Sequence, residues 1–172
     1  MTKPFHFNTV FNPPPFSGQP LNVGLDDWIM YGRRGDWIVP DYQRPSVWDA
    51  DRSGQYIGFL LEGGEPTPLI VQRWNTNRPD ELVDGLQRST AIQLWMDGEI
   101  PAILSNNDRV WLKEIPTDQQ AIMFRRLSIL VKYSHCRSRR EVLELYLRIN
   151  RGGVHHTDDE INRVRSLMES VK

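Results

Sequence analysis

The sequence predicts an α+β fold, in which helices pack against a small mixed sheet and a helical segment closes the C-terminal end. Two observations carry this prediction. Short, mostly apolar runs, such as 69–71 and 81–83, alternate with longer segments of helical periodicity, such as 138–149. Glycine, proline or helix-capping residues separate these runs. The chain of 172 residues is long enough for one domain with its own hydrophobic core.

The N-terminal segment differs in composition from the rest of the chain. Residues 13–15 are consecutive prolines, and scattered aromatic residues surround them. Such a segment favours an extended conformation over a helix or strand. We therefore divide the chain into an extended proline-rich arm, residues 1–21, and a single domain, residues 22–172.

The first half of the domain shows a helix, a strand and a second helix. Residues 22–35 predict a short helix, since acidic residues lie near its start, arginines lie near its end and Gly35 follows. Residues 37–39 predict a short strand, and Pro40 and Pro45 then bracket a loop. Asp49 is a candidate N-cap for a helix over residues 49–62, which Gly63 and Gly64 would end.

The remaining elements follow the same logic. Residues 69–71 and 81–83 predict neighbouring strands, the second of which leads through Asp-Gly into a helix over 86–96. Residues 101–112 predict a hairpin with its turn at 105–108. Within 122–133 a strand is favoured at least at the end, because apolar and polar residues alternate there. Helices over 138–149 and from the Thr157–Glu160 capping box to about Ser170 complete the prediction.

Composition excludes several classes of protein. Lysine and arginine number 21 against 22 aspartates and glutamates, so any attraction to nucleic acid must come from a local basic patch. The single cysteine, Cys136, excludes an internal disulfide and suits a reducing compartment. Neither a secretory leader nor a run of eighteen apolar residues is visible. We expect a soluble protein of the cytoplasm that has no membrane partner.

The segment from Asp84 to Thr90 predicts an anion-binding site. A strand breaks at Asp84-Gly85 and a helix starts at once, so that unpaired amides and the positive end of the helix dipole coincide. Gly85 would permit a tight turn, Arg88 can form a bidentate contact with phosphate, and Ser89 and Thr90 add hydroxyl groups. The alternative is an ordinary buried helix that Asp84 caps, with Arg88 in solvent.

Three separated motifs indicate a family. They are the stretch Val39-Pro40-Asp41-Tyr42-Gln43-Arg44-Pro45 with the following Val47-Trp48-Asp49, the stretch Asp84-Gly85-Leu86-Gln87-Arg88, and the stretch Leu147-Arg148-Ile149-Asn150-Arg151-Gly152-Gly153 with Glu160-Ile161. In order and spacing they resemble the ParB/sulfiredoxin superfamily, and within it the N-terminal domains of GmrSD-type and SspE-type DNA-defence enzymes. The signature of that family is Asp-Gly-Gln-Gln-Arg, and Leu86 departs from it.

The resemblance implies a ParB/sulfiredoxin-like fold that binds a nucleoside triphosphate, such as GTP, CTP or ATP, together with Mg²⁺. Arg44 and Arg88 would neutralise the phosphates, while Gln43 and Gln87 would orient an oxygen or a water. Tyr42 would stack or donate its hydroxyl. The implied catalytic set is Gln43, Asp84, Gln87 and Arg88, and the implied nucleotide-binding set is Tyr42, Arg44, Gly85, Ser89, Thr90, Asn150, Arg151 and Gly152. Candidate Mg²⁺ ligands are Asp84 and Glu160, and Asp41 and Asn150 also remain open.

The function implied by the resemblance is nucleotide binding, with hydrolysis, in DNA restriction, in the sensing of DNA modification or in a phage counterpart. Larger relatives carry an HNH-type nuclease domain after this one, so we expect a separate nuclease or a host protein as partner, inside a bacterial cell. One alternative is a phosphotransferase that acts on a small or DNA acceptor. Another is a catalytically silent module that binds a partner protein, an alternative that Leu86 keeps open.

A second candidate surface is basic. The residues Arg125, Arg126, Lys132, Arg137, Arg139 and Arg140 gather within a short stretch of sequence. Arg137, Arg139 and Arg140 in particular are candidates for contacts with DNA phosphates. The alternative is a solvated helix start and strand edge, and a homo-oligomer also remains open.

Overall fold

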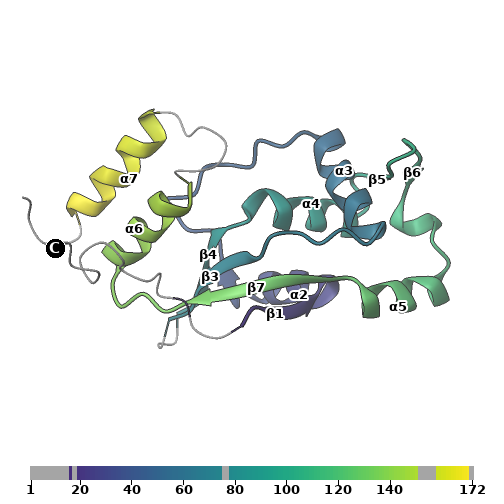
Figure 1. Ribbon diagram of the computed structural model, residues 1–172, viewed down its shortest axis with the longest axis horizontal. Helices are drawn as coiled ribbons and strands as arrows, with labels where there is room; N and C mark the ends of the chain where they lie inside the picture. The colour runs from purple at the N-terminus through teal and green to yellow at the C-terminus, as the bar shows by residue number, and fades with distance from the viewer. Residues whose placement is uncertain (1–15, 17–18, 75–77, 151–157, 171–172) are drawn as a thin grey trace, which may run out of the picture.

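The protein is built around a five-stranded sheet with strand order β1-β7-β3-β4-β2 (Figure 1). The computed structural model describes residues 16, 19–74, 78–150 and 158–170. The strands are β1 (Leu21–Gly24), β2 (Trp37–Ile38), β3 (Leu69–Gln72), β4 (Asp80–Asp84) and β7 (Ser128–Ser134). The pairs β1/β7 and β3/β4 are antiparallel, whereas β3/β7 and β2/β4 are parallel. The expected α+β class and mixed sheet are therefore confirmed.

Six α-helices accompany this sheet within the described residues. They are α2 (Leu25–Arg34), α3 (Ala50–Leu61), α4 (Leu86–Met96), α5 (Thr117–Arg126), α6 (Arg139–Asn150) and α7 (Asp158–Ser170). A small hairpin of β5 (Ala102–Ile103) and β6 (Arg109–Val110) precedes the 3₁₀ turn η1 (Leu112–Glu114). Among the described residues, no helix combines the length and apolar character needed to cross a membrane.

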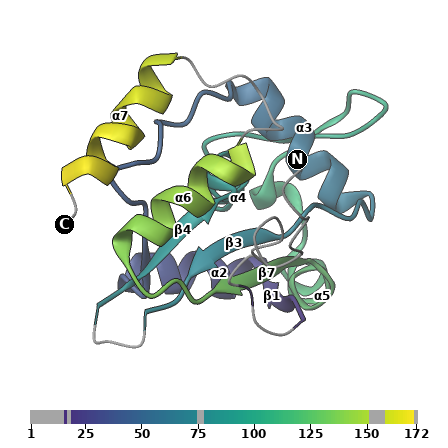
Figure 2. The same ribbon diagram turned by 60° about the vertical axis from the view of Figure 1, so that its left-hand side comes forward.

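Two hydrophobic cores lie on opposite faces of the sheet. On β4, Leu82 belongs to the core formed with α2, α3 and α4, and the adjacent Val83 belongs to the core formed with α6 and α7. Successive side chains of a strand point to opposite faces, so this change at neighbouring positions is expected. Figure 2 shows α6 and α7 together on one side of the sheet, away from α2. The carboxyl end of β4 thus lies between both helical layers.

Local signals predicted several elements correctly. The side chain of Asp49 accepts a hydrogen bond from the Arg52 amide at 2.7 Å and caps α3. Gly35 ends α2 in the left-handed conformation, with φ of 77°. The predicted hairpin around residues 105–108, both predicted central strands and the last two helices are present.

Two parts of the chain differ from the prediction. Residues 22–24 were assigned to the first helix, but they belong to β1, which pairs with β7 from Leu21↔Val131 to Gly24↔Ser128. This tertiary pairing overrides local propensity. The helix α5, over residues 117–126, was not predicted, because most of its residues are polar and it buries none of them fully. The strand predicted at the end of 122–133 is β7.

Candidate functional site

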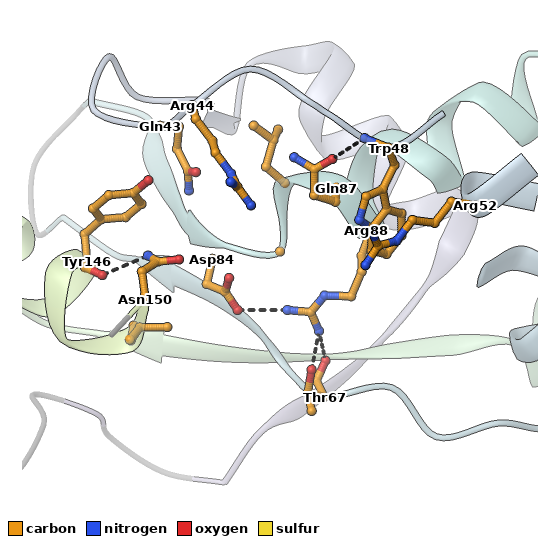
Figure 3. A pocket seen from close by; sticks show the side chains of 13 residues that line it. Gln43, Arg44, Trp48, Arg52, Thr67, Asp84, Gln87, Arg88, Tyr146 and Asn150 are labelled. Carbon is orange, nitrogen blue, oxygen red and sulfur yellow. Dashed lines mark hydrogen bonds and ion pairs between the residues drawn. The ribbon is translucent and has the colours of Figure 1, made fainter. Parts of the chain in front are cut away.

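A pocket of about 570 Å³ opens where β4 ends and α4 begins (Figure 3). Four parts of the chain line it. They are the Tyr-Gln-Arg loop (residues 40–48) with the start of α3, the stretch before β3, the β4–α4 turn, and the last turn of α6. These parts are distant in sequence, and the sheet and both helical layers bring them together.

The β4–α4 turn forms the centre of the pocket wall and depends on Gly85. Its φ of 99° is a left-handed conformation, and a Cβ atom at this position would lie 2.1 Å from Cδ2 of Leu69. The first helical bond runs from the Ser89 amide to the Gly85 carbonyl at 2.9 Å. The amides of residues 86–88 therefore precede the helical ladder, as at any helix start. Gly85, and not Asp84, is the N-cap, and no side chain caps the helix.

Arg88 and Arg44 line the same pocket, as the family resemblance implies. Arg88 is largely covered, with 13% of its side chain exposed, and its Nη2 pairs with Oδ2 of Asp84 at 2.8 Å. Its Nη1 donates to Oγ1 of Thr67 at 2.8 Å and also to the Thr67 carbonyl. The guanidinium is thereby fixed beside the Gly85 turn, and it does not extend into solvent.

The two predicted glutamines hold the Tyr-Gln-Arg loop in place. Oε1 of Gln87 accepts hydrogen bonds from the Ser46 hydroxyl and from the amides of Val47 and Trp48, at 2.9–3.0 Å. Nε2 of Gln43 donates to the carbonyls of Leu82 and Val83 on β4, at 2.9 and 2.7 Å. Both side chains line the pocket. Through these hydrogen bonds, Gln43 and Gln87 hold the loop against β4 and α4.

Three residues of the predicted nucleotide-binding set lie outside the pocket lining. The ring of Tyr42 is buried and lies 5.0 Å from that of Tyr146, and burial raises the pKa of its hydroxyl far above the usual range. Ser89 is also buried, and its hydroxyl accepts a hydrogen bond from Nε1 of Trp28 at 2.8 Å. Thr90, the third residue, follows Ser89 in α4. Tyr42 thus packs against a residue that lines the pocket, Tyr146, whereas Ser89 contacts α2.

The last turn of α6 closes the opposite side of the pocket. Asn150 lines it, and its Nδ2 donates to the Tyr146 carbonyl at 2.8 Å. Arg151 and Gly152, which the sequence also places here, lie outside the described residues, as does the side chain of Glu160.

Sequence reasoning missed the lining residues Arg52, Thr67 and Tyr146. The guanidinium of Arg52 lies over the ring of Trp48, with Cζ 5.0 Å from the ring centroid. Trp48 is the last residue of the Tyr-Gln-Arg loop, and Arg52 follows it by four residues, after the Asp49 cap. This spacing at a helix start was the available signal. Nothing in the sequence pointed to Thr67, which precedes β3.

One acidic side chain, Asp84, lines the pocket among the described residues. Within the same part of the chain, no three His, Cys, Asp or Glu residues gather to form a metal site. Mg²⁺ is often held by one or two carboxylates together with phosphate oxygens and water. Asp84 fits this arrangement, and Figure 3 shows its second carboxylate oxygen turned away from Arg88.

The basic residues near α6 do not form one face with those of α5. Arg125 and Arg126 end α5, whereas Arg139 and Arg140 begin α6, and β7 separates the two groups. A strand of this length spans roughly 20 Å. Figure 1 shows α5 and α6 at opposite ends of β7.

Arg139, the central member of the predicted DNA-binding set, forms ion pairs with two carboxylates of the protein itself. Its Nη1 contacts both carboxylate oxygens of the buried Glu81, at 3.0 and 3.2 Å, and its Nη2 pairs with Asp41. The neighbouring Arg140 pairs with Glu144 at 3.2 Å along α6. Arg137 is exposed. The ion pair of Arg139 therefore ties α6 to β4 and to the Tyr-Gln-Arg loop.

Comparison with known proteins adds one match. A family described as "GmrSD restriction endonuclease, N-terminal domain" matches residues 25–166. The matched region contains every described residue that lines the pocket. No curated protein matches the chain.

Proposed function

Because the chain belongs to the family of GmrSD restriction endonuclease N-terminal domains, we propose that its pocket binds the phosphates of a nucleoside triphosphate during DNA restriction. The family indicates a role in restriction and DNA defence, and the binding of a nucleotide is the part that we propose. One observation carries it. Arg44 and Arg88, from distant parts of the sequence, line one pocket whose wall is the first turn of α4.

The charges of this pocket suit a polyanion. Three arginines, Arg44, Arg52 and Arg88, face one acidic residue, Asp84, among the described lining residues. The amides that begin α4 and the helix dipole add partial positive charge at the Gly85 turn. Guanidinium groups form strong, often bidentate bonds with phosphate oxygens. A triphosphate would therefore find several charge-assisted donors in a space of about 570 Å³.

Mg²⁺ would accompany the phosphates in this proposal. Asp84 is the described side chain with the right chemistry, since a hard carboxylate oxygen lies at the pocket wall. The ion would neutralise part of the triphosphate charge. Asp84 would then contact both Mg²⁺ and Arg88.

The glutamine contacts favour nucleotide binding over rapid hydrolysis. A catalytic Gln87 would use its side-chain oxygen to orient a water. That oxygen, Oε1, already accepts three hydrogen bonds from the Tyr-Gln-Arg loop. Hydrolysis remains part of the proposal because Gln43 could orient the water. Its side-chain oxygen, Oε1, could accept a hydrogen bond from that water. A second candidate, a binding module without turnover, is favoured by the Gln87 contacts and by Leu86.

The test is equilibrium binding of GTP, CTP, ATP and UTP in Mg²⁺, followed by measurement of phosphate release with and without DNA. We expect at least one triphosphate to bind, and Arg44→Ala to weaken it roughly tenfold or more, as the loss of a charge-assisted bond implies. Arg109→Ala is the matched control, because Arg109 is an exposed, paired arginine outside the pocket. Failure of all four nucleotides to bind at millimolar concentration would contradict the proposal.

Binding without phosphate release would support the second candidate. Loss of triphosphate only when an acceptor is present would instead indicate a phosphotransferase. Each outcome is read from the same samples.

A further inference from the structure

The guanidinium of Arg52 lies over the ring of Trp48 at one end of the pocket. Arg52 Cζ lies 5.0 Å from the Trp48 ring centroid, and both side chains line the pocket. In Figure 3 Trp48 and Arg52 lie on the right, and Tyr146 and Asn150 lie on the left. Arg52 is exposed and Trp48 is half-buried. Planar groups are thus presented to the pocket beside its phosphate-binding wall.

Contacts on several sides fix this pair before any ligand arrives. The Trp48 amide donates to Oε1 of Gln87 at 3.0 Å, and the Arg52 amide donates to the Asp49 cap at 2.7 Å. Behind Trp48, the ring of Tyr56 packs at a tilt of 60°, with the centroids 5.6 Å apart. A surface held in this way loses little conformational entropy when a ligand binds.

Arg88 connects this pair with the Gly85 turn. Burial raises the pKa of Tyr56 to about 12, and the positive charge of Arg88 acts against that rise. In the pocket wall Arg88 follows Gln87, whose side chain accepts a hydrogen bond from the Trp48 amide, and Nη2 of Arg88 contacts Asp84. A ligand held by Arg88 at its phosphates would have its other end within reach of Trp48 and Arg52.

We infer that Trp48 and Arg52 form the subsite for the nucleobase of the nucleotide, an inference that rests on the function proposed above. Bases stack on tryptophan rings and on arginine planes, largely whatever their identity. The opposite end of the pocket suits this role less. Its aromatic side chain, Tyr146, is 3% exposed and packs against Tyr42.

A base subsite predicts different affinities for a nucleoside triphosphate and for tripolyphosphate. Inorganic tripolyphosphate offers the phosphates without a base, so it would use the Gly85 turn and the arginines but not the stacking surface. Stacking contributes roughly tenfold in affinity, within the range measured for base–aromatic contacts. Wild-type protein should therefore bind the preferred nucleoside triphosphate about tenfold more tightly than tripolyphosphate.

The experiment measures both ligands in Mg²⁺, by calorimetry, on the full chain and its variants. Trp48→Leu should lower affinity for the nucleotide to the level of tripolyphosphate and leave the affinity for tripolyphosphate unchanged. Trp48→Phe, which keeps a ring, should retain most of the difference. Trp111→Leu is the matched control, since Trp111 is another half-buried tryptophan with a cation over its ring, outside the pocket.

Two results would overturn the inference while leaving the proposed function intact. One is that Trp48→Leu binds the nucleotide as tightly as the wild-type protein does. The other is an equal loss for nucleotide and tripolyphosphate, which would show that Trp48 only shapes the phosphate wall. If wild-type protein binds neither ligand, the proposed function itself fails, and the two failures are thus distinguishable.

Discussion

Asp84 and Arg88 form an ion pair across the turn that begins α4, with Oδ2 and Nη2 2.8 Å apart. Both side chains line the pocket, and 33% and 13% of them, respectively, are exposed. The carboxylate thus occupies, on Arg88, a position that a phosphate oxygen could take. In the function proposed above, Mg²⁺ would relieve this competition by drawing Asp84 to itself, and the pair would then link phosphate binding to the metal.

We predict that Asp84→Asn weakens the dependence of nucleotide binding on Mg²⁺. Without Mg²⁺, the variant should bind triphosphate several-fold more tightly than wild type, because the neutral amide neither repels phosphate nor holds Arg88 as strongly. Calorimetric titrations in EDTA and in Mg²⁺ measure both values. Asp80→Asn, at the other end of β4, is the matched control. An unchanged ratio between the two conditions would show that Asp84 plays no part in metal-linked binding.

Arg88→Ala should destabilise the fold as well as abolish phosphate binding. The substitution leaves Asp84 without its partner in a partly covered position, which costs about 1–3 kcal/mol in the free energy of unfolding. In the double variant Asp84→Asn/Arg88→Ala, part of that loss should be recovered, because no unpaired charge remains. Urea denaturation of the four proteins of this cycle measures the coupling. Strictly additive effects would mean that the ion pair contributes nothing to stability.

Gln87→Ala should loosen the Tyr-Gln-Arg loop. Three donors, from Ser46, Val47 and Trp48, would lose their common acceptor. The amides of Val47 and Trp48 should then exchange with deuterium at least several-fold faster than in wild type, while those of α4 stay protected. Gln93→Ala, an exposed position on the same helix, controls for the loss of a glutamine. Unchanged exchange would show that other contacts hold the loop.

Arg139→Ala should reduce stability far more than Arg137→Ala. Arg139 pairs with Glu81, of whose side chain 7% is exposed, so its removal leaves a nearly buried carboxylate unpaired and costs about 3 kcal/mol. Arg137 is exposed, and its replacement should change stability by about 0.5 kcal/mol or less. Thermal or urea denaturation distinguishes the two. If both variants lost equally little stability, the ion pair with Glu81 would be unimportant. Arg139 would then again be a candidate for surface contacts with DNA.

Cys136 should be unreactive in the folded protein. Burial raises the pKa of its thiol to about 11, so the thiolate, which is the nucleophile, is scarce at pH 8. Because this pKa is higher in the folded protein than in the unfolded chain, the thiol should also reduce stability as pH rises from about 9 to 11. A thiol assay at pH 8, native and in denaturant, checks the first expectation. Equal rates in both states would contradict the buried position.

Local signals in the sequence predicted much of the fold, and long-range contacts explain what they missed. Asp49, Gly35 and Gly85 act where their chemistry indicated, as a cap, a helix end and a tight turn. The strand β1 escaped prediction because its identity depends on β7, which lies far away in sequence. Only the fold could reveal such a partner.

The candidate site shows the same division. Family motifs indicated that Arg44 and Arg88 meet, and both line the pocket. Periodicity could not show that the Ser89 hydroxyl accepts a hydrogen bond from the Trp28 indole, or that Arg139 pairs with Glu81. In both cases a polar residue that looked available for a ligand satisfies a buried group from another element, and sequence spacing carries no information on such pairs.

The most direct test of the central claim is a crystal structure with a non-hydrolysable nucleoside triphosphate and Mg²⁺. We predict phosphate density against the amides of residues 86–88, with the guanidinium groups of Arg44 and Arg88 on either side. Triphosphate bound elsewhere on the protein, with this pocket holding only water, would contradict the account.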